Sequence, residues 1–211
     1  SRPSEAVLYL PGFNTPLSWA AQRMGQLLAL ARLPSHIKPV LLSWPGGWAM
    51  SYLAARSATR QPWMADDLLH LLESLAASGI TRVHILAHSM GAAVLLHALP
   101  RLLAAPSFER SGVRLANVVL LSPDFPLHAF EEGTTRLLEF LAAAHGTLTT
   151  IYGDRHDKPL GYGELMNRFV MRPEEGWRSL GRLWPVRGLD CDIIDTTWMQ
   201  AGLPAREPDL A

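Results

Sequence analysis

Residues 83–91, VHILAHSMG, form the most informative segment of this sequence. Its first half is rich in apolar residues, as expected of a buried strand, and AAVLL at 92–96 continues with the composition of a helix. Between the two, Ser89 occupies a sharp turn from strand to helix. A turn of this kind strains the serine backbone and makes the hydroxyl project above the sheet.

Ser89 is therefore the leading candidate for a catalytic nucleophile. The residues two positions before and after it, Ala87 and Gly91, are small enough to avoid a clash in the turn, although the first is usually glycine. The following helix directs its N-terminal N–H groups toward the site, so we expect the Met90 N–H to stabilise a developing oxyanion. The alternative interpretation is an ordinary strand–helix turn with an incidental serine.

Loops from other parts of the chain are expected to meet near this turn. The segment LPGFN at 10–14 follows the first strand, and its Phe13 N–H is the expected second oxyanion donor. Trp44, Trp48 and Phe125 also lie in loops and are candidates for lining a substrate pocket. Packing of these aromatic rings against the sheet is an equally good interpretation.

Strand-like and helix-like segments alternate along the chain. Apolar runs predict six strands, at Ala6–Leu10, Ile37–Ser43, Arg82–Ala87, Leu115–Leu121, Thr147–Tyr152 and Asp192–Asp195. Helical spacing predicts helices at about 17–31, 63–78, 91–103 and 134–144. This alternation predicts an α/β fold with a doubly wound, mostly parallel, six-stranded sheet and flanking helices. We expect one domain over residues 1–203, with 204–211 as a tail or truncated end.

Composition excludes several classes of protein. The 19 basic and 19 acidic residues give a net charge of zero and form no basic block, which argues against nucleic acid as a partner. Cys191 is the only cysteine, so a disulfide framework cannot form within the chain. No apolar run reaches the roughly 18 residues of a membrane helix. We expect a soluble protein of the cytoplasm or periplasm, and its oligomeric state stays open.

Several segments together carry a resemblance to a known family. They are LPGFNT at 10–15, SWPG at 43–46, AHSMG at 87–91 and SPD at 122–124, extended by YGDRHD at 152–157 and ID at 194–195. Through them the sequence resembles a bacterial α/β-hydrolase-like family of unknown function. The resemblance implies the six-stranded core of the hydrolase sheet, without the first two strands of larger members. It also implies Ser89 as nucleophile and Asp157 as the catalytic acid.

The sequence departs from this family in two places. Pro11 stands where the family usually has histidine before the glycine of the oxyanion loop. The base histidine of the family lies in a Gly-His pair after the last strand, whereas no histidine follows His156 in this chain. The first departure affects the orientation of the loop, and the second affects the catalytic base itself.

Three aspartates are candidates for the acid that orients a base. The order serine, acid, histidine favours Asp157, which follows the fifth strand. Asp154 is a local competitor, and Asp124, after the fourth strand, is the main alternative. Each is also interpretable as a solvated or turn-capping aspartate in a loop.

The sequence has no histidine at the position expected for the catalytic base. His128 and His156 lie in loops that should open on the carboxyl edge of the sheet, so both are candidates, although each breaks the expected chain order. His156 is also adjacent to Asp157, which is an awkward position for an acid that must orient it. Two interpretations remain: the base lies beyond Ala211, or the protein is a hydrolase-fold binding module without a full triad. The intact turn around Ser89 favours the first.

The function we expect is hydrolysis of a small-molecule carboxylic ester through an acyl-enzyme on Ser89. Thioesters and amides use the same machinery and stay open as substrates. The short segment 124–134 leaves no room for a large lid, which favours small or soluble esters. We expect no cofactor and no metal, because the Asp154, His156 and Asp157 spacing matches no zinc motif. The segment GYG at 161–163 is interpreted as a turn.

Overall fold

Six parallel strands form one sheet in the computed structural model, in the order β2-β1-β3-β4-β5-β6. The structure describes residues 4–46, 51–170, 178–182 and 191–199. The strands are β1 (Ser4–Leu10), β2 (Ile37–Leu41), β3 (Ile80–His88), β4 (Arg114–Leu121), β5 (Leu148–Gly153) and β6 (Asp192–Asp195). The doubly wound parallel sheet predicted from the sequence is thereby confirmed.

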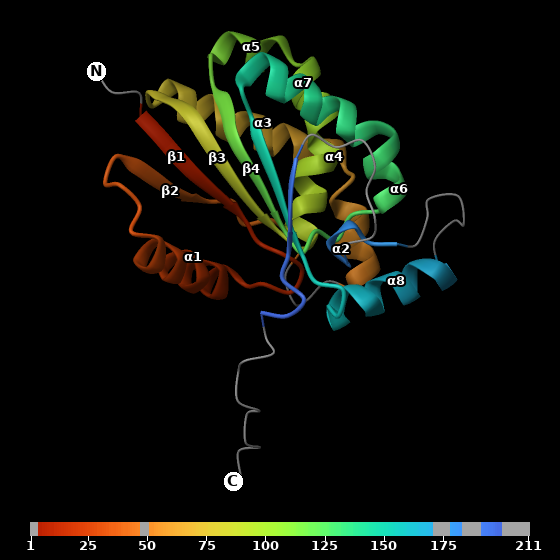
Figure 1. The fold of residues 1–211 in the computed structure, drawn as a ribbon. Coiled ribbons are helices and arrows are strands. Elements are labelled where there is room, and N and C mark those ends of the chain that lie inside the picture. Colours follow the sequence, from red (N-terminus) through yellow and green to blue (C-terminus); the bar gives the residue numbers. More distant parts are fainter. Residues whose placement is uncertain (1–3, 47–50, 171–177, 183–190, 200–211) are drawn as a thin grey trace.

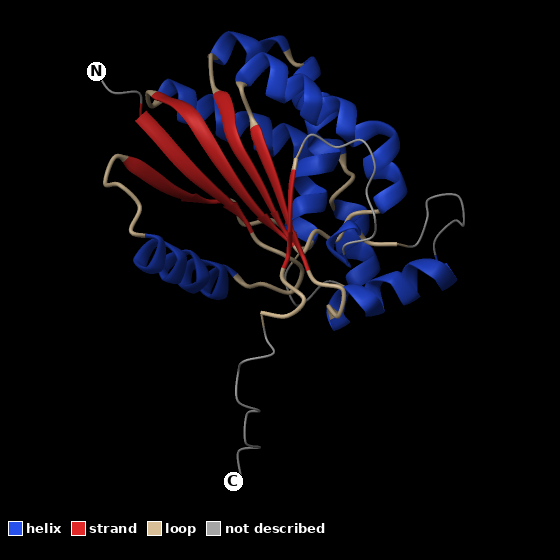
Figure 2. Ribbon diagram, viewed as in Figure 1, coloured by secondary structure: helices blue, strands red, loops and turns tan. Residues whose placement is uncertain are grey.

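Helices cover both faces of the sheet (Figures 1 and 2). The helices are α1 (Leu17–Ala31), α2 (Tyr52–Ala58), α3 (Pro62–Ala77), α4 (Met90–Ala104), α5 (Pro106–Ser111), α6 (Leu127–Ala129), η1 (Phe130–Thr134), α7 (Thr135–His145), α8 (Lys158–Val170) and η3 (Leu180–Arg182). Helix α1 lies on one face, while α3, α4 and α7 lie on the other (Figure 1). This layering follows from the right-handed crossovers that connect parallel strands.

The main core lies between the sheet and helix α4. Along β3, Val83, Ile85 and Ala87 are buried, and they alternate with half-buried residues on the opposite face. Helix α4 is apolar around most of its circumference and is buried almost throughout, so it packs between the sheet and α3. The strand and helix that flank Ser89 are therefore among the most firmly packed elements of the molecule.

Helix α8 is the main difference from the sequence-based expectation, because GYG at 161–163 lies inside it and does not form a turn. Asp157 precedes the helix, and its Oδ1 accepts a hydrogen bond from the Leu160 N–H at 2.8 Å. A Cβ atom on Gly163 would lie 2.8 Å from the Tyr52 hydroxyl. The glycine is thus explained by close packing of α8 against α2, which local sequence patterns do not reveal.

Helix α8 lies near the carboxyl ends of the strands, on the side of the molecule opposite α1 (Figure 1). Among the described residues, no helix is both long and apolar enough to cross a lipid bilayer.

Candidate active site

The turn at Ser89 has the strained geometry expected of a nucleophile. Strand β3 ends at His88, helix α4 begins at Met90, and Ser89 between them has φ 51° and ψ −121°. Hydrogen bonds hold this conformation: the Ser89 N–H donates to the Leu121 carbonyl at 2.8 Å, and the Ser89 carbonyl accepts from the Asp124 N–H at 3.1 Å. The neighbouring strand β4 and its loop therefore stabilise a backbone conformation that a serine rarely adopts.

The small residues around the turn are required by a close approach of the oxyanion loop. A Cβ atom on Gly91 would lie 2.6 Å from the Pro11 carbonyl oxygen and would also overlap the Leu10 carbonyl oxygen. A Cβ atom on Gly12 would lie 3.0 Å from the Ser89 Cβ. The loop after β1 is therefore in direct contact with the turn that carries Ser89.

Two backbone N–H groups are available at this junction. The N–H groups of Phe13 and Met90 donate no hydrogen bond within the described part of the chain. The loop that carries Phe13 is fixed, because the Trp44 Nε1 donates to the Pro11 carbonyl at 2.7 Å and the Asn14 N–H donates to the Gly46 carbonyl at 2.6 Å. Unpaired N–H groups on a fixed loop and at a helix N-terminus suit the binding of a developing negative charge.

A pocket with a volume of about 460 Å³ opens beside Ser89. It is lined by Phe13, Asn14, Thr15, Arg23, Tyr52, His88, Ser89, Asp124, Pro159, Leu160, Tyr162, Gly163 and Met166. These residues come from the oxyanion loop, α1, α2, the Ser89 turn, the loop after β4, and α8. Its size is in the range of small-molecule sites.

Asp124 is a buried carboxylate in the wall of this pocket. The Tyr52 hydroxyl donates to its Oδ2 at 3.0 Å, and the Arg56 Nη1 lies 3.6 Å from its Oδ1. The same Nη1 donates to the Tyr52 hydroxyl at 3.2 Å. Burial raises the pKa of the Asp124 carboxyl, against the opposing effect of Arg56 and of the hydrogen bond from Tyr52. The three side chains form a compact cluster, which adjoins the Ser89 turn through the hydrogen bond from the Asp124 N–H to the Ser89 carbonyl.

Asp157 is placed at the start of α8 and is half-buried. Burial raises the pKa of its carboxyl, whereas the hydrogen bond from the Leu160 N–H and the Ser122 side chain act in the opposite direction. Unlike Asp124, it does not line the pocket beside Ser89. Its competitor Asp154 accepts the His156 N–H at 2.7 Å and so stabilises the local turn.

The two histidines proposed as alternative bases are not brought into the pocket. His128 is exposed and pairs with Glu132, its Nε2 lying 3.1 Å from the carboxylate oxygen. His156 is exposed, and its ring makes an edge contact with Trp198 at 5.6 Å between ring centroids. His88 is the one described histidine in the pocket lining.

His88 is a poor proton acceptor in this environment. Its Nδ1 is buried and makes no hydrogen bond to the described residues. Burial, and to a smaller extent the charge of Arg23, lowers the pKa of its imidazole from the ordinary 6.5 to about 4. The ring is therefore neutral near pH 7.

The aromatic residues predicted to line the pocket have other positions. Trp44 is buried, and its Nε1 donates to the Pro11 carbonyl, so it holds the oxyanion loop and does not line the pocket. Phe125 is also buried and packs on His97 and Phe130, with centroid distances of 4.9 and 6.5 Å. Trp48 lies outside the described residues. In their place, the apolar part of the pocket comes mainly from α8, which sequence periodicity did not predict.

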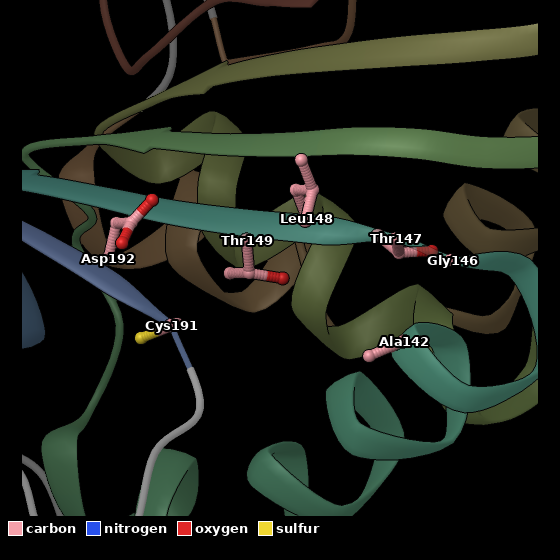
Figure 3. Close-up of a pocket in the computed structure, with 7 residues that line it drawn as sticks. All are labelled: Ala142, Gly146, Thr147, Leu148, Thr149, Cys191 and Asp192. Atoms are coloured by element: carbon pink, nitrogen blue, oxygen red, sulfur yellow. The ribbon is translucent and has the colours of Figure 1, made fainter.

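A second pocket, of about 330 Å³, lies at the opposite edge of the sheet, where β5 and β6 begin (Figure 3). Its lining consists of Ala142, Gly146, Thr147, Leu148, Thr149, Cys191 and Asp192. None of the site residues predicted from the sequence belongs to it. The chemistry expected of this chain is therefore concentrated at the carboxyl edge.

Comparison with known proteins identifies the family of this chain. Residues 1–179 match the model of a family described as alpha/beta hydrolase of unknown function (DUF900). The chain belongs to this family. No curated protein matches it.

Among solved structures, this alpha/beta hydrolase is similar to a "putative hydrolase" from Agrobacterium vitis S4, whose crystal structure was determined at 1.80 Å. The TM-score is 0.52 at 15% sequence identity, over 90% of this chain and 78% of that one. At this identity the likeness shows a shared fold. Family and fold together support assignment of the chain as a hydrolase.

Proposed function

We propose that this protein is a serine hydrolase that cleaves carboxylic esters through an acyl-enzyme on Ser89. The observation that carries the proposal is the backbone of Ser89, at φ 51° and ψ −121°, between a buried strand and a buried helix. This conformation is strained for serine, and strain of this kind is retained where the surroundings enforce it, often at functional sites. A pocket of small-molecule size beside the hydroxyl supports the same interpretation.

The proposed reaction has two stages. The Ser89 Oγ attacks the ester carbonyl carbon while its proton passes to a base, and the carbonyl oxygen becomes an oxyanion. The N–H groups of Phe13 and Met90 donate to that oxygen. The intermediate then expels the alcohol, which takes the proton from the base, and water releases the acid from the acyl-enzyme by the same steps.

Asp157 is the proposed acid, and we assign the base to a group outside the described residues. The carboxylate of Asp157 is held by the Leu160 N–H, which donates to its Oδ1 at 2.8 Å, and this suits a group that must hold an imidazole in one orientation. Asp124 is the alternative acid, but it is already bonded to Tyr52 and lies beside Arg56. We do not assign this role to His88, because its Nδ1 is buried without a partner among the described residues and burial lowers the pKa of its imidazole to about 4.

A second candidate function is a binding module with a hydrolase fold. It is favoured by one observation: within the described part of the chain, no histidine except His88 lines the Ser89 pocket. In that case the pocket binds a ligand but does not catalyse its hydrolysis.

Labelling with a fluorophosphonate probe tests the proposal, because the probe reacts with activated serines. We expect labelling of the intact protein and of Ser57→Ala, a matched control at an exposed serine of α2, and none of Ser89→Ala. Hydrolysis of p-nitrophenyl butyrate should follow the same pattern. Equal labelling of the intact protein and Ser89→Ala removes this serine from the mechanism, and labelling of neither supports the binding module.

A further inference from the structure

The pocket beside Ser89 has two chemically different walls. Helix α8 contributes Pro159, Leu160, Tyr162 and Met166 to one wall. Asn14, Thr15 and Arg23, from the oxyanion loop and α1, contribute the other. The two helices flank the carboxyl ends of the strands in Figure 1. Because residues of both helices line one pocket, a ligand beside Ser89 can contact both walls.

Arg23 is a cation without an internal partner. It lies on α1 next to Met24, whose buried side chain packs toward the sheet, and it is exposed at the pocket. Within the described part of the chain, it forms no ion pair and no hydrogen bond. The Arg23 charge also reaches the Ser89 site, because it disfavours protonation of His88.

The other charged group of the pocket lining does not neutralise this cation. Asp124 is paired with Arg56 and accepts the Tyr52 hydroxyl, both of them from α2. Burial further disfavours the charged form of the Asp124 carboxyl. The Arg23 guanidinium is therefore available to bind an anion from solution.

The apolar wall is incompletely covered. Tyr162 is 70% exposed and Met166 is 42% exposed, although both line the pocket. Large apolar side chains at the mouth of a concave site mark a surface on which a ligand gains by excluding water. A ligand that contacts both walls therefore needs an apolar part and an anionic part.

We propose that the Ser89 pocket selects esters that carry a carboxylate at one end, bound by Arg23, and an apolar group at the other end, bound by α8. A carboxylate fits this wall because a single planar guanidinium pairs with it through two parallel hydrogen bonds. A dianionic phosphate would leave one charge unpaired, because Arg23 is the one cationic side chain among the described residues that line the pocket. This inference rests on the proposed function as an ester hydrolase and adds to it the chemical class of the ester.

Binding of unreactive ligands tests the selection without requiring turnover. The probes are 4-butylbenzoate, its neutral analogue 4-butylbenzamide and the dianionic 4-butylphenylphosphonate, titrated by calorimetry into the intact protein. We expect the benzoate to bind about tenfold more tightly than the amide, which is the size of a charge-assisted hydrogen bond. Arg23→Gln should remove this preference. Arg136→Gln, which removes the same charge from an exposed position on α7, should leave it intact.

Several results overturn the inference. They are equal affinity for benzoate and amide, a preference that survives Arg23→Gln, or no binding of either ligand up to the solubility limit. Tighter binding of the phosphonate than of the benzoate overturns the choice of a carboxylate. The same titrations on Ser89→Ala separate this inference from the proposed function. If Ser89 is not labelled but the benzoate preference persists, the selection stands and the ester hydrolase does not.

Discussion

Gly91 provides the sharpest test of the packing around the nucleophile. In Gly91→Ala, the new methyl group would lie 2.6 Å from the Pro11 carbonyl oxygen and would overlap that of Leu10. Neither atom can move freely, because Leu10 is paired with Ala87 in the sheet and the Pro11 carbonyl accepts the Trp44 Nε1. The substitution therefore forces the oxyanion loop away from the Ser89 turn.

The expected cost follows from this overlap. Overpacking of a rigid core costs about 1–3 kcal/mol, and we expect about 3 kcal/mol here because the obstacles are backbone atoms. For a chain of this size, that loss lowers the midpoint of thermal unfolding by about 6–12 °C. The protein should still fold, since domains are stable by about 5–15 kcal/mol.

Urea unfolding followed by circular dichroism measures the effect. The matched control is Gly25→Ala, the same chemical change in the exposed middle of α1, where a Cβ atom meets nothing within 4 Å. This control should gain about 0.5–1 kcal/mol, because alanine favours helix more than glycine does. A Gly91→Ala variant within about 0.5 kcal/mol of the parent would refute the close approach. So would equal effects of the two substitutions.

Two further predictions concern buried polar groups near Ser89. Arg56→Met leaves the buried Asp124 carboxyl without its cation, so the free energy of unfolding should fall by about 3 kcal/mol in urea titrations at pH 8. This loss of stability should be smaller at pH 5, because the Asp124 carboxyl, with its raised pKa, is more easily neutralised there. Adding Asp124→Asn to the Arg56→Met variant should recover part of the lost stability. An equal loss at both pH values contradicts the buried charge. His88 has its pKa lowered to about 4 in the folded protein, against an ordinary 6.5, so it stabilises the fold above pH 6.5 and this stability is lost as the pH falls toward 4. His88→Asn should flatten that part of the curve of unfolding free energy against pH, and an identical slope in both proteins rejects the shift.

Local sequence predicts the elements around Ser89 because local forces produce them. The apolar residues of 83–86 and of 92–96 predict a buried strand and a helix by spacing and composition alone. The small residues at 87 and 91 then identify the turn between them, since only a small side chain fits there. The order of strands and helices also fixes the parallel sheet, because crossovers between parallel strands have one hand.

Helix α8 is an element that local sequence does not predict. GYG at 161–163 has poor helix propensity, so local sequence predicts a turn there. In the structure the helix starts beyond the Asp157 carboxylate, and Gly163 fits against the Tyr52 hydroxyl. The packing that compensates for the glycines comes from α2, about 110 residues away in the sequence. The local pattern of residues in α8 therefore cannot indicate it.

Local sequence is thus enough to predict the sheet and the Ser89 turn, and to propose the two oxyanion donors, because backbone sterics and hydrophobic period act over a few residues. Tertiary packing, in contrast, brings Arg23, Tyr52 and Asp124 to one pocket and bonds Trp44 to the oxyanion loop. The Tyr52–Asp124 hydrogen bond joins residues 72 positions apart. Such contacts depend on strand order and on how helices pack against the sheet, and these are properties of the whole chain.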